Sequence, residues 1–222
     1  MKTALESFLK NFLEPFSYLI YACVLFIKLR RDRTFEKKVL FVYYICATLL
    51  LLVASFLVIY TAEDIDNNWL YNIFYLITIC ILSYYFYQIL NNRTKKYVVT
   101  FLLVINLVLF IVYDIMLKHF YKEYNAYVVA ICFLSIVVYA LLYFDQLLRN
   151  VSELNILYKF DFWLVSGYLF YFLGCFFIIL FYQSAAIEQR GNVWTLQNVI
   201  LFLSSLITLS GNLWMHYHKK LY

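Results

Sequence analysis

The stretch VLFVYYICATLLLLVASFLVIY, residues 39–60, contains no charged side chain. A helix needs about 20 consecutive apolar residues to cross the hydrocarbon core of a bilayer, and this stretch reaches that length. It lacks the alternation of polar and apolar residues that marks the strands of an outer-membrane barrel. We therefore expect residues 39–60 to form a transmembrane helix.

Six further runs of the same character lie on either side of this stretch. The connectors between the runs are short, which is typical of antiparallel neighbours in a helical bundle. The sequence predicts an all-α integral membrane protein in which residues 1–222 form a single seven-transmembrane-helix bundle. The predicted spans are 12–28, 39–60, 69–90, 97–116, 126–144, 162–183 and 196–215.

Composition supports the same class. Of 222 residues, 65% are hydrophobic and 14% are charged, whereas soluble domains have about 25% charged residues. A soluble fold of this size would need a polar surface that this chain does not have. The net charge of +5 might suggest a nucleic-acid partner, but the distribution of the charges favours a role in membrane topology.

The basic residues are unevenly divided between the two predicted sides of the membrane. The connectors after the first, third and fifth spans, together with the C-terminus, hold 13 of the 18 Lys and Arg residues. Because basic loops stay in the cytoplasm, we expect the N-terminus outside and the C-terminus inside. The most basic connector, KLRRDRTFEKK at 28–38, can also be interpreted as a binding site for anionic lipid or for a partner protein.

Motifs for catalysis and for cofactor binding are absent from the sequence. It has no HExxH, GxSxG or P-loop pattern, and the last span has no lysine for a retinal Schiff base. All five cysteines fall within predicted spans without metal-binding spacing, so we expect packing rather than disulfides or a metal site. We expect a protein that is not an enzyme and that binds no cofactor and no nucleic acid.

Several polar residues fall inside the predicted spans, mostly toward the outer ends. Asn106 lies near the middle of its span, and Tyr113 and Asp114 follow on the same side of the helix. Solvation at the membrane surface, under a belt of Trp and Tyr, accounts for such residues. The alternative is an outward-opening pocket for a small polar or cationic molecule. The candidate ligand-binding residues are Glu14, Asn72, Asn106, Asp114 and Asn198.

Two helices carry faces of small residues. Gly167 and Gly174 are seven residues apart, and Ser204, Thr208 and Gly211 recur at helical spacing on the last span. Small residues allow transmembrane helices to approach closely. We expect these faces to pack against a neighbouring helix of the chain, with a groove for a partner protein's helix as the alternative.

The sixth span also resembles a known group. Phe162, Trp163, Gly167, Leu169, Tyr171 and Gly174 match the pattern P-x-F-W-I-x-x-G-x-L-I-Y-x-x-G of small bacterial seven-helix membrane proteins. Phe160 stands in place of the proline. In the third span, Asn72 matches, but Thr78 stands where that group has an acid.

Members of this group are usually described only as hypothetical proteins, and they often occur beside sensor histidine kinases. The resemblance implies a bacterial inner-membrane location and a signalling role.

Three function classes follow from these observations. The first is a receptor-like sensory subunit that lacks an output domain and signals through a partner, such as a sensor kinase. The second is an accessory or structural subunit of a larger membrane complex, which short loops and packing grooves suit equally well. The third is a small-molecule carrier, which a polar track through the middle of the membrane would favour.

Overall fold

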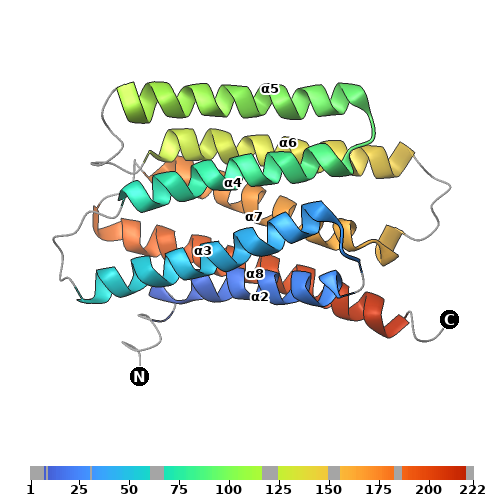
Figure 1. The fold of residues 1–222 in the computed structure, drawn as a ribbon. Coiled ribbons are helices and arrows are strands. Elements are labelled where there is room, and N and C mark those ends of the chain that lie inside the picture. The colour runs from blue at the N-terminus through green and yellow to red at the C-terminus, as the bar shows by residue number, and fades with distance from the viewer. Residues whose placement is uncertain are drawn as a thin grey trace.

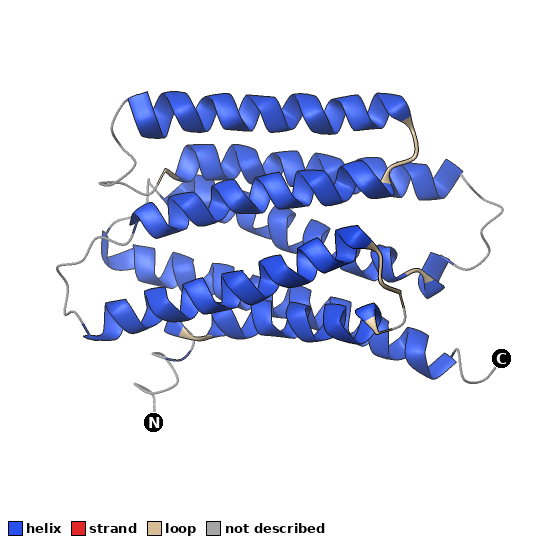
Figure 2. Cartoon of the chain, viewed as in Figure 1, coloured by secondary structure: helices blue, strands red, loops and turns tan. Residues whose placement is uncertain are grey.

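In the computed structural model, the structure describes residue 8 and residues 10–30, 32–60, 68–116, 125–149, 156–182 and 187–218. Within these residues every regular element is a helix (Figure 2). Six of the helices are long and apolar enough to cross a membrane, and a seventh helix accompanies them. The chain is thus an integral membrane protein built as a helical bundle.

Each of the seven predicted spans corresponds to one long helix. The π-helix η1 continues α5, and the short 3-10 helix η2 precedes α7. The bounds are α2 Leu13–Leu29, α3 Phe35–Tyr60, α4 Asn68–Ile89, α5 Arg93–Phe110, η1 Ile111–Met116, α6 Ala126–Arg149, η2 Ile156–Tyr158, α7 Phe160–Tyr182 and α8 Ile187–His218.

Six helices form a ring, and the seventh lies outside it. Going round the ring, α2 packs against α3, α3 against α4, α4 against α6, α6 against α7, α7 against α8, and α8 against α2. Helix α5 contacts α4 and α6 and forms the outermost layer (Figure 1). Consecutive helices run antiparallel, as the short connectors predict.

The fourth predicted span differs from a continuous α-helix. It begins as α5 and ends as the π-helix η1, which has one more residue per turn and so rotates the residues that follow. Asn106 is 1% exposed, whereas Tyr113 is 39% exposed. The expectation that these two side chains share one side of a regular helix is therefore wrong. The predicted end of the sixth span, Gln183, lies outside the described residues.

Tyrosines fill the centre of the ring. Tyr21 on α2 stacks on Tyr44 of α3 with ring centroids 4.9 Å apart. The Tyr44 hydroxyl donates to the Tyr168 hydroxyl of α7 at 2.6 Å, and the Tyr85 hydroxyl of α4 donates to Asp161 at 2.7 Å. A buried tyrosine needs a partner for its hydroxyl. These hydrogen bonds therefore connect helices that face each other across the ring.

Helices α7 and α8 approach each other closely at Gly167. The Ser204 hydroxyl donates to the Gly167 carbonyl oxygen at 2.6 Å. A methyl group added at Gly167 would lie 2.5 Å from the Thr208 hydroxyl oxygen and 3.1 Å from the Ser204 carbonyl oxygen. One added at Gly174 would lie 3.2 Å from a side-chain carbon of Ile200. The small-residue faces thus lie against each other within the chain.

Gly211 makes room in the same interface. A methyl group at this position would run into the Trp163 ring of α7. The aromatic side chain therefore needs a residue without a side chain beneath it.

A row of polar contacts holds α5 against α6. Lys95 donates to the Leu142 carbonyl oxygen at 2.8 Å, and the Tyr139 hydroxyl donates to the Val99 carbonyl oxygen at 3.1 Å. Further along, Asn106 Nδ2 donates to the Ser135 hydroxyl at 2.8 Å. Lipid removes the hydrophobic drive for helix association, so such contacts carry much of the attachment of a peripheral helix.

The close approach at Gly167 gives a stability prediction. Gly167→Ala should destabilise the protein by about 1–3 kcal/mol, the usual cost of overpacking, because one of the atoms in the way is backbone. The measurement is the midpoint of thermal unfolding in detergent. Gly191→Ala is the matched control in α8, because its added methyl group would lie 3.7 Å from Lys10 Nζ, an ordinary contact. A Gly167→Ala protein as stable as the control would contradict the close approach.

Candidate functional site

The residues predicted to bind a ligand fall into separate groups. Asn72 and Asn106 line one small cavity between α4, α5 and α6. Glu14 lies in the first turn of α2, and Asn198 is buried on α8. Asp114 belongs to η1, and its side chain lies outside the described residues.

The cavity beside Asn106 is polar and very small. Asn72, Asn106 and Asn125 contribute amides to its wall, and its volume is about 10 Å³. A cavity of about 10–15 Å³ is the minimum for one water molecule. Asn106 Nδ2 donates to the Leu102 carbonyl oxygen and to Ser135, whereas Oδ1 is buried without a partner among the described residues. This place suits one water molecule and excludes an organic ligand.

Glu14 is the most unusual group in the interior. It is 3% exposed, and its Oε1 atom is buried with no hydrogen-bond partner in the described part of the chain. Tyr18, Tyr71 and Tyr171 lie within electrostatic range of its carboxyl group. A carboxylate without a partner in an apolar interior is costly, and such residues in membrane proteins usually have a functional partner.

Polar side chains of neighbouring helices fix the surroundings of Glu14. Gln197 Nε2 on α8 donates to the hydroxyls of Tyr75 and Tyr171 at 3.1 and 3.2 Å. Asn198 Nδ2 donates to the Lys10 carbonyl oxygen at 3.1 Å, just before α2 begins. One amide of α8 thus binds a tyrosine of α4 and a tyrosine of α7, and the second of these, Tyr171, lies within electrostatic range of Glu14.

An aromatic rim connects this interior group to the surface. The ring of Tyr71 meets Trp194 edge to face at 4.9 Å, and Trp194 meets Tyr182 at 6.4 Å. The Arg190 guanidinium lies over the Tyr182 ring, 5.5 Å from its centroid. Aromatic ring faces attract cations in this way. In this rim, the Tyr182 ring already contacts the Arg190 guanidinium.

Sequence analysis missed several residues of this group. Tyr71, Tyr171 and Gln197 were not among the candidate ligand residues, although each lies beside Glu14 or beside one of its tyrosine neighbours. A chain with 23 tyrosines offers no local signal that separates these two from the rest. For Gln197, the available signal was its spacing, because it lies seven residues before Ser204 and so on the same side of the helix.

The described residues contain no group of three or more His, Cys, Asp and Glu side chains that could hold a metal ion. The five cysteines are free, with Cys132 and Cys175 buried and Cys23 and Cys46 exposed. The polar groups around Glu14 are therefore amides and hydroxyls rather than metal ligands.

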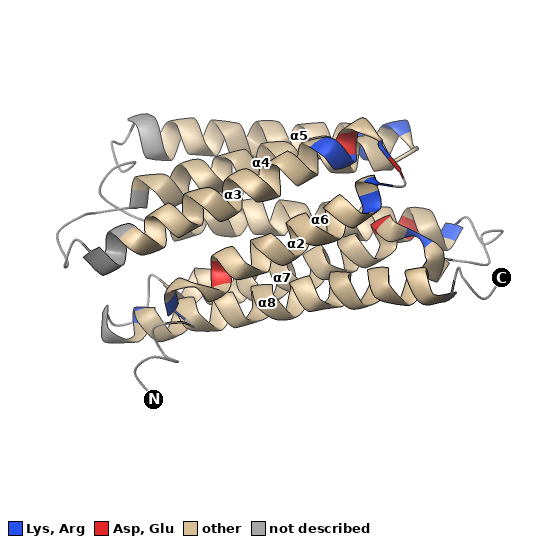
Figure 3. Cartoon of the chain, turned by 60° about the horizontal axis from the view of Figure 1, so that its bottom comes forward, with Lys and Arg blue, Asp and Glu red and all other residues tan. Residues whose placement is uncertain are grey.

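A second polar region lies at the opposite end of the bundle. Charged residues gather there, where α2 ends and where α3 and α5 begin (Figure 3). An open pocket of about 500 Å³ lies between the α4–α5 turn and the end of α6. Its walls are Asn91, Asn92, Thr94, Lys95, Asp145, Gln146 and Arg149.

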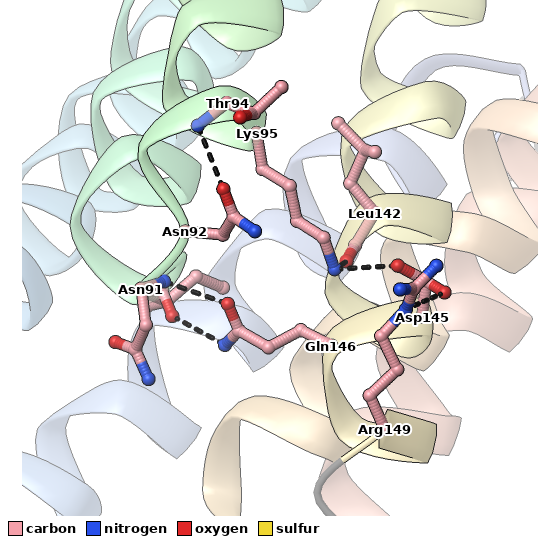
Figure 4. Close-up of polar contacts among 9 residues, drawn as sticks. Asn91, Asn92, Thr94, Lys95, Leu142, Asp145, Gln146 and Arg149 are labelled. Atoms are coloured by element: carbon pink, nitrogen blue, oxygen red, sulfur yellow. Dashed lines mark hydrogen bonds and ion pairs between the residues drawn. The ribbon is translucent and has the colours of Figure 1, made fainter.

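The polar groups of this pocket bind mainly one another (Figure 4). Lys95 forms an ion pair with Asp145 at 2.8 Å, and Arg149 approaches the other oxygen of Asp145 at 2.9 Å. Gln146 accepts from the Asn91 backbone nitrogen at 2.7 Å and donates to the Ile89 carbonyl oxygen at 3.2 Å. These bonds fasten the α4–α5 turn to α6, which is a structural role.

No protein-family model, curated protein or solved structure matches the chain.

The Lys95 contacts predict a difference between two basic residues of the same pocket. Lys95→Met should lower the midpoint of thermal unfolding in detergent, because Lys95 is buried and joins α5 to α6. Arg149→Gln should leave the midpoint nearly unchanged, because its side chain is 77% exposed and surface ion pairs contribute little. Equal midpoints for the two variants would show that Lys95 does not hold α5 in place.

Proposed function

We infer that the protein is a receptor-like sensory subunit of the membrane that binds a small organic cation beside Glu14 and signals through a partner protein. The observation that carries this proposal is the buried Glu14 carboxyl group, whose Oε1 atom has no hydrogen-bond partner among the described residues. The resemblance of the sixth span to a group found beside sensor histidine kinases supports a kinase as the partner.

The surroundings of Glu14 favour an ammonium group as the ligand. A carboxylate supplies the opposite charge, and a ring face of a neighbouring tyrosine turned toward the ligand would add cation–π attraction of about 0.5–2 kcal/mol. The cavity beside Asn106 has room for only about one water molecule. Of the predicted ligand residues whose side chains the structure describes, Glu14 is thus the one whose chemistry calls for a counter-ion.

The proposal includes an orientation in the membrane. All seven helices cross the bilayer, with α2, Leu13–Leu29, as the shortest crossing. The N-terminus lies outside and the C-terminus in the bacterial cytoplasm, because basic residues gather at the end where α2 stops (Figure 3). In this orientation, the ligand enters from outside, past the rim of Tyr71 and Trp194.

The ligand proposal predicts that cation binding depends on the charge of Glu14. Purified protein is titrated with the series from methylammonium to tetramethylammonium, and the midpoint of thermal unfolding is measured. We expect at least one cation to raise the midpoint. Glu14→Gln should weaken that binding about 10- to 100-fold, the value of a hydrogen bond to a charged group.

Glu36→Gln is the matched control for this experiment. Glu36 lies in the first turn of α3, at the basic end of the bundle. The Glu36→Gln protein should bind the cation as the wild type does. If no cation of the series shifts the wild-type protein, the receptor proposal fails and an accessory role in a larger complex becomes the preferred function.

The orientation predicts which engineered cysteines a membrane-impermeant thiol reagent reaches in intact cells. A cysteine in place of Asp64 should react, and one in place of Arg93 should react only after the membrane is opened. Asp64 lies outside the described residues, whereas Arg93 is exposed at the start of α5. The reverse labelling pattern would show that the orientation is inverted and that the Glu14 end of the bundle lies on the cytoplasmic side.

A further inference from the structure

A long groove runs along the outer face of α3 and α4. Its volume is about 490 Å³, and apolar side chains form almost all of its wall. The groove belongs to the surface that faces lipid, since Val42 and Ile77 in its wall are 58% and 42% exposed. The lining residues are Phe35, Lys38, Val39, Val42, Tyr43, Cys46, Ala47 and Leu50 of α3, with Phe74, Ile77 and Ile81 of α4.

One end of the groove carries a single positive charge. Lys38 is exposed and has no ion-pair partner among the described residues. Its neighbour Lys37 points elsewhere and forms an ion pair with Asp32. The Lys37 ammonium group holds the pKa of Asp32 below its ordinary value. Asp32 is thus already neutralised by Lys37, and Glu36, two residues before Lys38, lies on a different face of α3. The charge of Lys38 is therefore left for an anion.

The groove is long enough for one acyl chain of a lipid. A helix rises about 1.5 Å per residue, so the wall from Phe35 to Leu50 extends about 22 Å. Half of the roughly 30 Å hydrocarbon core is about 15 Å. The groove is therefore long enough to hold an acyl chain that starts at the membrane surface beside Lys38 and crosses one leaflet of the bilayer.

We propose that the α3–α4 groove binds an anionic phospholipid, with its phosphate at Lys38 and one acyl chain along α3 and α4. The occupant must be apolar over most of its length and negative at one end, because the wall has the complementary pattern. The one hydroxyl in the wall, that of Tyr43, is already bonded to Thr78 at 2.7 Å. A helix of a second copy would place apolar residues along the groove but would leave Lys38 without a counter-charge.

The experiment measures lipid retention by native mass spectrometry. Wild-type protein in mild detergent is mixed with dioleoyl phosphatidylglycerol or dioleoyl phosphatidylcholine. The anionic lipid should be retained preferentially. Lys38→Gln should weaken retention of phosphatidylglycerol about fivefold, equivalent to the ~1 kcal/mol of one basic residue at an anionic surface. Retention of phosphatidylcholine should not change.

Two further variants make the result specific. Val42→Trp fills the groove from an exposed position and should reduce retention of both lipids. Arg93→Gln removes the same charge from an exposed position at the start of α5 and should retain both lipids as the wild type does. Because none of these variants alters the bundle interior, the test does not depend on the ligand of Glu14.

Three results would overturn the proposal. The first is equal loss of phosphatidylglycerol in the Lys38 and Arg93 variants, which would indicate a general charge effect. The second is unchanged lipid retention by Val42→Trp. The third is a disulfide cross-link between Cys46 residues of two copies in vesicles, because Cys46 lines the groove and a second copy would then be its occupant.

Discussion

The contact among Tyr21, Ser204 and Gly167 is the constraint on which the arrangement of the bundle depends. Ser204 has one hydroxyl proton, which it donates to the Gly167 carbonyl oxygen. The Tyr21 hydroxyl must therefore donate to Ser204, to which it is hydrogen-bonded. Three helices, α2, α7 and α8, meet at this point. Only a residue without a side chain at 167 allows the hydroxyls to approach, so the glycine and the tyrosine depend on each other.

Hydrogen bonds of buried tyrosines constrain the other helices of the ring in the same way. Between membrane helices, apolar surface alone gives little drive for association, because lipid is as apolar as the helix. Hydroxyl groups that must find partners select one arrangement of α3, α4 and α7, as in the contacts Tyr44–Tyr168 and Tyr85–Asp161. Helix α5, which contributes no tyrosine to this core, is instead held by Lys95 and Asn106.

The length of the apolar runs made the helices predictable from the sequence, and the spacing of Gly167, Ser204 and Thr208 pointed to close packing. The positions of Glu14 and Asn72 in separate groups were not predictable. Each lies toward one end of its span, but which neighbour it faces depends on how the ring closes. The π-turn at Ile111–Met116 also has no signal in residue type, since it is a shift in hydrogen bonding rather than in composition.

Tyr43 belongs both to the bundle interior and to its lipid-facing surface. Its ring meets Tyr18 edge to face at 6.4 Å, and Tyr18 follows Glu14 by one turn of α2. The same residue forms part of the wall of the α3–α4 groove. Coupling between two sites needs an element with two arrangements that both sites bias. Tyr43 lies between the two proposed sites, with its ring against Tyr18 on one side and in the wall of the groove on the other. Ligands at both sites would therefore act on the packing of this one ring.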